Sequence, residues 1–298
     1  MNGKGIAIYG KTIQEEFFPY LEKMLCRIKA EGIALDCELG FATFLAEHFG
    51  CKDWFRQLYR QHDFPREDTA LLLSIGGDGT FLDAVLYVRD SGIPVLGMNT
   101  GRLGFLANIS VDEVDEAVEY ICGGVYDTEP RDVLGLKVKG GNFPGFTYGL
   151  NEVGVHKTDS SSMLKIHAYI GDIYLTTYWA DGLIVATPTG STAYSLSGGG
   201  PIVSPACKNI ILTPVCPHNL TMRTLVVPDA AVIRLKVEGR SGDFMLSLDS
   251  RLERMSDDCE IEITTGDFKI NVVKLPGHDY YETLRDKLGW GGDIRNGK

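Results

Sequence analysis

The fold class of this chain can be inferred from one segment, Leu71-Leu72-Leu73-Ser74-Ile75-Gly76-Gly77-Asp78-Gly79-Thr80. Its apolar first half is short and lacks polar alternation, which is typical of a strand buried on both faces. Residues 80–88 follow with the apolar spacing of a helix, so three glycines and one aspartate occupy a strand-to-helix corner. Glycines permit positive φ and close ligand approach, and the first N–H groups of a helix can receive a phosphate.

Asp78 is the unusual residue of this corner, because a carboxylate normally repels phosphate. Its presence indicates chemistry, either as a general base or as a partner of a metal ion. The alternative is structural, since aspartate is also a good helix N-cap. Both interpretations stay open on spacing alone.

The composition and net charge are those of a globular protein that does not bind nucleic acids or membranes broadly. The chain has 298 residues, of which 44% are hydrophobic and 23% charged, as in ordinary globular proteins of one large or two smaller domains. The formal net charge of −11 argues against a broad nucleic-acid-binding or anionic-membrane surface, so neither partner is expected.

The cysteines and the N-terminus indicate a cytoplasmic protein. The seven cysteines form no C-x-x-C pair, which favours free thiols in a reducing compartment over a disulfide framework or a zinc site. The start of the chain lacks a signal-peptide layout, and no apolar run approaches the ~18 residues of a membrane span. The six histidines show no ligand spacing, and no residue is assigned as a metal ligand.

The first 125 residues alternate predicted strands and helices, which predicts an α/β domain with an open, mostly parallel sheet. Residues 5–12 match the P-loop pattern literally, but we reject that motif because its strand lies inside the pattern instead of before it. No G-x-G-x-x-G occurs, so an ordinary Rossmann site is not supported. Besides the opening stretch, the expected elements are a strand at 6–9, a helix at 12–30, a strand at 33–39, one or two helices over 41–60, a strand at 93–98 and a helix from 110 to about 121.

The pattern changes after residue 125. Residues 126–275 are predicted to form an all-β domain, and a helical tail at 280–288 follows. The expected strands are 134–139, 165–170, 173–178, 225–227, 232–237, 244–248, 259–264 and 268–275.

Three further segments are candidates for ligand binding. Residues 181–202 interrupt the β pattern with hydroxyls and glycines, which suit sugars and phosphates, although a capped short helix is the alternative. The glycine-rich run 99–106 follows a strand and is either a second place of close ligand approach or an ordinary loop. Asn151-Glu152 is a weaker signal, because such a pair is commonly a solvated strand end.

With these blocks identified, the chain resembles the NAD kinase family over nearly its whole length. That family carries, in this order, a Gly-Gly-Asp-Gly turn, an Asn-Glu pair and a long Asp-Gly…Thr-Pro-Thr-Gly-Ser-Thr-Ala-Tyr-Ser stretch. The matching segments are 76–79, 151–152 and 181–197, and the tail at 281–285 is similar too. Similar glycine turns occur in diacylglycerol kinases, sphingosine kinases and phosphofructokinases. The third motif, in contrast, is highly specific to the NAD kinase family.

The resemblance implies transfer of the terminal phosphate of ATP to the 2′-hydroxyl of the adenosine ribose of NAD, giving NADP. Asp78 would be the general base, and Gly79 would line the same pocket. Asn151 and Glu152 would hold adenosine, and Asp181 would contact the nicotinamide end. Contacts to the adenine and ribose side would come from Thr192, Ala193, Tyr194 and Ser197, and variable further contacts from Ser162, Cys216 and Arg251.

The resemblance also implies a divalent cation, Mg²⁺ by expectation, a site in the cleft between the domains, and a homo-oligomer, either a dimer or a tetramer. Residues 276–298 would pack back on the first domain. Two other functions are weighed against this one. A lipid kinase would need a basic or apolar membrane-facing surface, which the acidic balance disfavours, and a non-catalytic dinucleotide sensor would not need Asp78.

Overall fold

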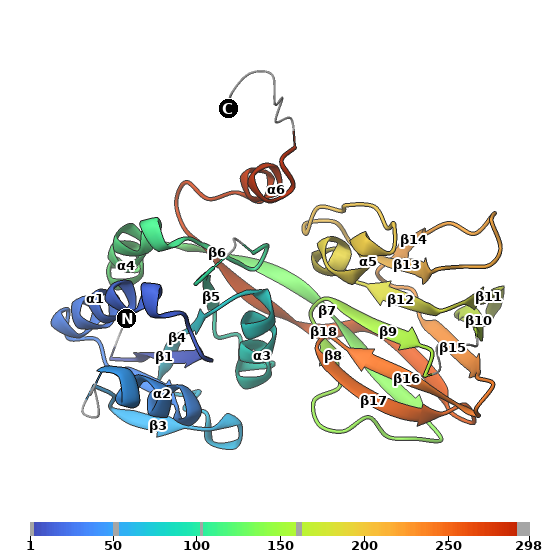
Figure 1. Cartoon of the computed structure of the whole chain (residues 1–298), viewed down its shortest axis with the longest axis horizontal. Helices are drawn as coiled ribbons and strands as arrows, with labels where there is room; N and C mark the ends of the chain where they lie inside the picture. Colours follow the sequence, from blue (N-terminus) through green and yellow to red (C-terminus); the bar gives the residue numbers. More distant parts are fainter. Residues whose placement is uncertain (1–2, 50–53, 102–103, 159–162, 291–298) are drawn as a thin grey trace. The chain divides into compact units, whose positions relative to one another are not determined.

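The computed structural model describes residues 3–49, 54–101, 104–158 and 163–290, and the chain divides into two compact units (Figure 1). Unit 1 combines residues 1–130 with 270–298, and unit 2 comprises residues 131–269. These boundaries differ by a few residues from the predicted 125/126 and 275/276. The reason is that two long strands, β7 (Asp127–Lys139) and β18 (Glu260–Lys274), contribute residues to both units, so no loop marks the boundary.

Unit 1 is an α/β layer structure, as predicted. Residues 41–60 are an exception to the prediction, because their helix ends at Phe49 and a strand occupies 57–59. That strand is short and mostly exposed, and it forms by pairing with β2 at the sheet edge, which its own sequence does not indicate. The elements are β1 (Gly5–Gly10), η1 (Glu15–Phe17), α1 (Phe18–Ala30), β2 (Leu35–Glu38), α2 (Leu39–Phe49), β3 (Gln57–Tyr59), η2 (Gln61–Asp63), β4 (Thr69–Ile75), α3 (Asp78–Val88), β5 (Val95–Met98), β6 (Ala107–Ile109), η3 (Val111–Glu113), α4 (Val114–Gly123) and α6 (Tyr280–Leu288).

The sheet of unit 1 is parallel at every pairing that the described residues make. Its order is β18-β5-β4-β1-β2-β3, and β6 adds to β5. The chain fills one side of β1 with β2 and β3 and then the other side with β4 and β5. The order therefore reverses between β1 and β4, which is where open parallel sheets commonly bind ligands, at the carboxyl ends of the strands.

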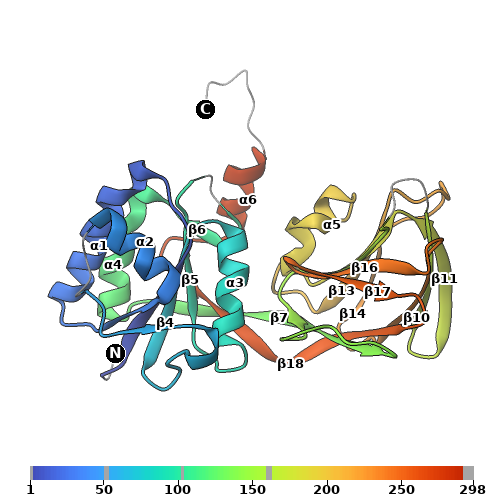
Figure 2. The same cartoon turned by 60° about the horizontal axis from the view of Figure 1, so that its bottom comes forward.

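Strand β4 is buried on both faces because helices cover both. Leu71, Leu73 and Ile75 belong to the core cluster that also holds apolar residues of α1, α2 and α4. The opposite face is covered by α3, whose Phe81 lies 2.9 Å from where a Cβ on Gly97 would stand. The unbroken apolar run in the sequence thus reflects burial on two sides. Figure 2 shows the helices arranged around this sheet.

The C-terminal helix α6 belongs to unit 1, in agreement with the prediction that the tail returns to the first domain. Leu284 is buried, and the Asp279 carboxylate caps the helix by accepting the Glu282 N–H at 2.8 Å. The preceding residue, His278, approaches Glu113 of η3 with 3.6 Å between Nε2 and Oε1.

Unit 2 is an all-β domain, as predicted, and its two sheets form a sandwich. A six-stranded antiparallel sheet has the order β14-β13-β12-β9-β16-β17, and the other sheet contains β11-β10-β15-β18 with β7 and β8. Alternate residues of both sheets meet in one apolar core. The further elements are β8 (Tyr148–Gly149), β9 (Glu152–His156), β10 (Leu164–Ile170), β11 (Ile173–Ala180), β12 (Gly182–Ala186), η4 (Thr189–Thr192), α5 (Tyr194–Ser197), β13 (Asn209–Val215), β14 (Leu225–Pro228), β15 (Ile233–Glu238), β16 (Asp243–Leu248) and β17 (Arg251–Ser256).

Two sequence interpretations of unit 2 were wrong. The predicted strands at 259–264 and 268–275 are one strand, β18, which continues through Gly266. The segment 181–202 does not only interrupt the β pattern, because its residues 182–186 form the core strand β12. Both faces of β12 are buried, one in the sandwich core and the other in a small cluster with Val203, and this removes the alternation that usually reveals a strand.

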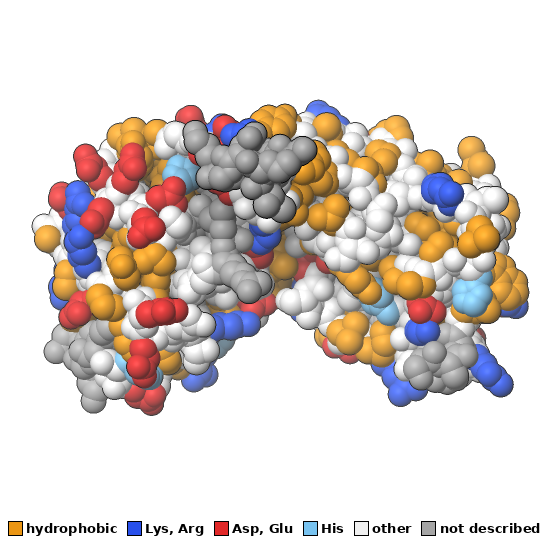
Figure 3. All heavy atoms as spheres, turned by 45° about the horizontal axis from the view of Figure 1, so that its top comes forward, with side chains coloured by type: hydrophobic (Ala, Val, Ile, Leu, Met, Phe, Trp, Pro, Cys, Tyr) orange, Lys and Arg blue, Asp and Glu red, His pale blue; other side chains and the backbone are white. Residues whose placement is uncertain are grey.

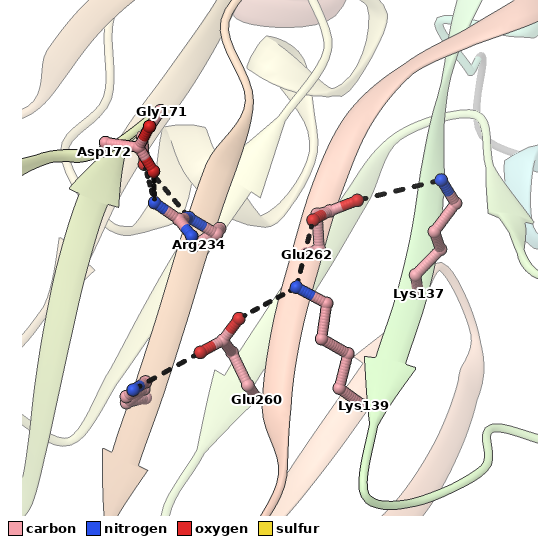
Figure 4. A network of polar contacts seen from close by, with 8 residues as sticks. Lys137, Lys139, Gly171, Asp172, Arg234, Glu260 and Glu262 are labelled. Carbon is pink, nitrogen blue, oxygen red and sulfur yellow. Dashed lines mark hydrogen bonds and ion pairs between the residues drawn. The ribbon is translucent and has the colours of Figure 1, made fainter.

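Charged side chains form ion pairs across the outer face where β7, β18 and β15 lie side by side (Figure 4). Lys139 contacts Glu260 at 3.1 Å and Glu262 at 3.5 Å, and Lys137 reaches Glu262 at 3.7 Å. Lysines and glutamates alternate across the strands, so the excess of acidic residues does not leave this face with one sign. In the view of Figure 3, acidic and basic side chains are interspersed over unit 1, whereas unit 2 shows mostly uncharged and apolar side chains.

Within the described ranges, no helix is long and apolar enough to cross a membrane. The six cysteines that the structure describes form no disulfide with one another.

Candidate active site

The glycine corner of unit 1 stands at the carboxyl ends of β4 and β5, beside the point where the strand order reverses. Ile75 and Met98 are register partners, and the Gly76 N–H donates to the Met98 carbonyl at 2.9 Å. Gly76 has φ +147°, and a Cβ there would stand 2.4 Å from Thr80 Oγ1. Only glycine satisfies both constraints, so the turn into α3 requires this residue.

Asp78, the first residue of α3, uses its carboxylate to hold the loop that follows β5. Oδ2 accepts the N–H of Phe105 at 2.9 Å, and Oδ1 accepts those of Leu106 at 3.0 Å and Ala107 at 2.9 Å. The loop passes so close that a Cβ on Gly104 would stand 1.9 Å from Oδ1. We call this arrangement the Asp78 clamp. Asp78 is therefore neither a simple N-cap nor an unattached carboxylate.

The N-terminal turn of α3 leaves donors available beside this carboxylate. Gly77 and Gly79 are exposed, and no atom lies within 4 Å of a Cβ built on either. Within the described part of the chain, the N–H groups of Asp78 and Gly79 make no hydrogen bond. A helix start with unpaired N–H groups and open space can receive a phosphate.

A pocket of about 300 Å³ opens in unit 1 next to the loop after β5. It is bounded on one side by residues that follow β5 and on the other by the C-terminal segment. Its lining residues are Asn99, Gly101, Asn108, Ser110, Glu113, His278, Glu282, Thr283 and Asp286. The predicted glycine-rich run 99–106 contributes Asn99 and Gly101 to it, whereas its residues 102 and 103 lie outside the described residues.

No group of three or more His, Cys, Asp or Glu residues in the described ranges could hold a metal ion by itself. Magnesium sites in phosphoryl-transfer enzymes commonly use one or two carboxylates and take their other ligands from substrate phosphates and water. The donor set here fits a cation that arrives on a phosphate substrate.

In unit 2, Asn151 and Glu152 lie at the start of β9 and are held by Asp249. The Asp249 Oδ2 accepts the Leu150 N–H at 2.8 Å, and Oδ1 accepts those of Asn151 at 2.8 Å and Glu152 at 3.1 Å. In return, the Asp249 N–H donates to the Glu152 carbonyl at 3.0 Å. We call this second arrangement the Asp249 clamp.

The Glu152 side chain is not the solvated strand end that its sequence context suggested. Its Oε2 is buried and has no hydrogen-bond partner among the described residues. Burial, together with the charge of Asp249, raises the pKa of Glu152 to about 8, against a smaller lowering by the Tyr194 N–H. A buried polar atom without a partner costs free energy, so this oxygen is available to a ligand.

The hydroxyl-rich segment after β12 packs against Asn151. The Thr187 hydroxyl donates to the Leu150 carbonyl at 2.7 Å and accepts the Gly190 N–H at 3.0 Å. A Cβ on Gly190 would stand 2.1 Å from the Asn151 carbonyl oxygen, so this close packing requires glycine.

Four predicted residues follow in this segment. Tyr194 is 45% exposed, and its ring centroid lies 5.7 Å from that of His156. Thr192 ends η4, Ala193 joins η4 to α5, and Ser197 is the exposed last residue of α5. Of these four, Tyr194 is the residue that the structure places against Glu152, because its N–H donates to the Glu152 carboxyl group.

Asp181 lies at the opposite end of β12. Its carboxylate contacts Lys157 Nζ at 2.8 Å, and its N–H donates to Val215, the residue before Cys216. Glu152 pairs with Ala186 and His156 with Gly182, so the two ends differ by four residues of strand, roughly 13 Å. An elongated ligand could contact both ends.

Three predicted contact residues remain, namely Cys216, Arg251 and Ser162. Cys216 is exposed and has φ +46°, at the same end as Asp181. Arg251 donates to the carbonyl groups of Phe146 and Tyr148, the latter at 2.6 Å, so it ties down the segment before Asn151. Ser162 lies outside the described residues.

Sequence reasoning missed Asp249, Thr187 and His156. Asp249 follows β16 in a two-residue turn and has φ +51°, a conformation that aspartate tolerates better than most residues. The only signal in the sequence was an aspartate after an apolar strand, as at Asp78. His156 lies over Gly154, where a Cβ would stand 2.3 Å from Nε2, and its ring bonds Ser247 Oγ at 2.9 Å.

Comparisons with known proteins match both units. A model of the ATP-NAD kinase N-terminal domain matches residues 13–126, and one of the ATP-NAD kinase C-terminal domain matches residues 150–275. The chain is 40% identical over 291 residues to the NAD kinase of Cytophaga hutchinsonii, with 97% of this chain and 99% of the relative covered. It is 41% identical over 298 residues to that of Flavobacterium johnsoniae, with coverage of 98% and 99%.

Two solved structures have a similar fold. Yeast NADH kinase complexed with NADH matches with a TM-score of 0.83 at 27% identity, covering 98% of this chain and 89% of the other. An NAD kinase from Archaeoglobus fulgidus in complex with ATP matches with a TM-score of 0.70 at 24% identity, covering 95% and 97%. The second likeness concerns the fold alone.

Proposed function

The chain belongs to the NAD kinase family and is a phosphotransferase, and we propose the following roles for its residues in the reaction. Unit 1 positions the phosphates of ATP and supplies the general base. Unit 2 binds NAD along β12, with adenosine at the Asn151–Glu152 end and the nicotinamide side at the Asp181 end. The products are ADP and NADP.

Asp78 takes the proton of the adenosine-ribose 2′-hydroxyl. As the hydroxyl oxygen bonds to the terminal phosphorus of ATP, the bond from that phosphorus to the ADP oxygen breaks. The observation that carries this role is the Asp78 clamp, which fixes the carboxylate beside unpaired helix N–H groups. Oδ2 accepts a single hydrogen bond among the described residues, so it retains acceptor capacity for a substrate hydroxyl.

The Gly79 N–H and its neighbours receive the donor's phosphates. Phosphoryl transfer depends mainly on positioning and on neutralising charge, and backbone donors at a helix start serve both purposes. We propose that Mg²⁺ enters with ATP as its complex, because the described residues offer isolated carboxylates and not a dedicated cage.

The NAD contacts follow the arrangement in unit 2. Asn151 and Glu152 bind the adenosine, and the exposed ring of Tyr194 stacks on it. Further contacts to the adenine and ribose side come from Thr192, Ala193 and Ser197, and a variable one comes from Cys216. Ser162 lies outside the described residues, so its contact stays a prediction. Because Arg251 already donates to two backbone carbonyls, we expect it to act by positioning the 146–148 segment.

A coupled assay tests the proposal. Purified protein is incubated with Mg-ATP and NAD, and NADP is followed with an NADP-specific dehydrogenase. We expect NADP with the wild-type chain and almost none with Asp78→Asn. NAD binding without NADP formation in the wild-type chain would contradict the proposal and support a sensor. A cytoplasmic homo-oligomer, dimer or tetramer, stays a prediction that light scattering of the purified protein tests in part.

A further inference from the structure

We propose that Asp249 is a positioning residue for NAD: its carboxylate fixes the Asn151–Glu152 turn, and its charge keeps a proton on Glu152, which then donates a hydrogen bond to the bound nucleoside. This inference rests on the proposed binding of adenosine by Asn151 and Glu152. It adds a residue that neither the sequence nor the proposed function had assigned, and it specifies the protonation state of the site.

The geometry supports the positioning role. Three consecutive N–H groups, those of Leu150, Asn151 and Glu152, end on one carboxylate at 2.8 to 3.1 Å. The N–H of Asp249 closes the arrangement on the Glu152 carbonyl. Without this carboxylate the three donors would lack acceptors, so the turn would lose its fixed shape. The start of β9 is therefore ordered before a ligand arrives.

The two carboxyl groups differ in their ability to hold a negative charge. Burial raises the pKa of Asp249, but the three N–H bonds that it accepts and the charge of Arg251 oppose this rise. Glu152 receives one N–H, from Tyr194, and its Oε2 has no partner among the described residues. The charge of the pair therefore resides on Asp249 and the proton on Glu152.

The described elements beside Glu152 add no further charge that would change which carboxyl group holds the proton. The neighbouring strand β12 carries no charged residue, and neither does η4. Burial lowers the pKa of His156, on the same strand as Glu152, which favours its neutral form. A neutral carboxyl group offers one donor and one acceptor, whereas an ionised one offers acceptors alone. Ionisation of Glu152 should thus weaken NAD binding.

The test is the pH dependence of KM for NAD between pH 6 and 9.5. In the wild-type chain we expect a flat KM at low pH and a rise of roughly tenfold per pH unit above about 8. Asp249→Asn should raise KM about 10-fold at pH 7, the equivalent of one lost charge-assisted contact, and shift the rise to lower pH. Glu152→Gln cannot ionise, so its KM should stay flat across this range.

Asp172→Asn is the matched control, because Asp172 is an exposed turn residue of the same unit that pairs with Arg234. It should reproduce the wild-type profile. A wild-type KM that is flat to pH 9.5, or an Asp249→Asn profile identical to the wild type, would overturn the inference while NADP formation still supports the kinase. If Asp249→Asn does not fold, the comparison of wild type with Glu152→Gln decides alone.

Discussion

Asp78 in unit 1 and Asp249 in unit 2 hold a backbone segment in place with the same set of contacts. Each carboxylate accepts three consecutive backbone N–H groups, the first on Oδ2 and the next two on Oδ1. Their surroundings differ. Asp78 starts a helix among exposed glycines, whereas Asp249 occupies a hairpin turn beside the buried Glu152 carboxyl group.

The same three-bond arrangement can therefore serve two purposes. Where a fixed carboxylate stands beside unpaired helix N–H groups and open space, the carboxylate can accept a proton from a substrate hydroxyl while the N–H groups bind a phosphate. Beside a second carboxyl group, a fixed carboxylate instead sets the protonation of its neighbour. We therefore expect changes at the Asp78 clamp to lower kcat, and changes at the Asp249 clamp to raise KM for NAD.

The largest effect is expected for Asp78→Asn. Removing the base should lower kcat by about 10²–10⁴-fold, while calorimetry still detects NAD binding. A kcat within a few-fold of the wild type would remove Asp78 from the role of base. The comparison would then fail, since both aspartates would be structural.

Gly104→Ala separates the geometry of the Asp78 clamp from its chemistry. The new Cβ would occupy the space of Asp78 Oδ1, so the carboxylate must move although it remains an acid. We expect kcat to fall by roughly 100-fold, as for an ångström-scale misplacement of a catalytic group.

The control for Gly104→Ala is Gly123→Ala at the end of α4, where the new Cβ would meet Val125 at an ordinary 3.5 Å. Its kinetics should match the wild type. Equal losses in the two variants would show that the effect is not specific to the clamp.

Gly79→Ala should divide stability from activity. Nothing lies within 4 Å of the new Cβ, and alanine in a helix is favoured over glycine by up to about 1 kcal/mol, so the melting temperature should rise slightly. The methyl group would stand where we expect the phosphates, so kcat/KM for ATP should fall several-fold. An unchanged kcat/KM for ATP would place the phosphates elsewhere.

The smallest effect concerns stability. Because the folded chain holds the Glu152 proton up to about pH 8 while the unfolded chain loses it near 4.5, stability should decrease as pH rises across that window. Glu152→Gln removes this loss. Its melting temperature should match the wild type near pH 5 and exceed it by a few degrees at pH 9, as scanning calorimetry can show. Parallel curves for the two proteins would mean that Glu152 ionises normally.

Some of this organisation could be predicted from sequence. The apolar run before Gly76 indicated a strand between helices, and the glycines around Asp78 indicated a site, because both depend on residue types at neighbouring positions. Strand β3 and the double burial of β12 could not be predicted, since each depends on which other elements pack against it.

The clamps themselves were outside the reach of sequence patterns. The Asp78 partners lie 27 to 29 residues away and the Asp249 partners 97 to 99, and all of them are backbone N–H groups. Every residue except proline carries such a donor, so no side-chain identity records the contact. Two glycines do record the close packing around the clamps, because a Cβ on Gly104 would stand 1.9 Å from Asp78 Oδ1 and one on Gly149 would stand 3.1 Å from Asp249 Oδ1.

The most direct test measures kcat and KM for NAD in Asp78→Asn and Asp249→Asn side by side, at saturating Mg-ATP and pH 7. We expect Asp78→Asn to lower kcat with little change in KM, and Asp249→Asn to raise KM with little change in kcat. If both variants change the same kinetic parameter, or if Asp78→Asn changes KM and Asp249→Asn changes kcat, the two clamps do not have the separate roles proposed here.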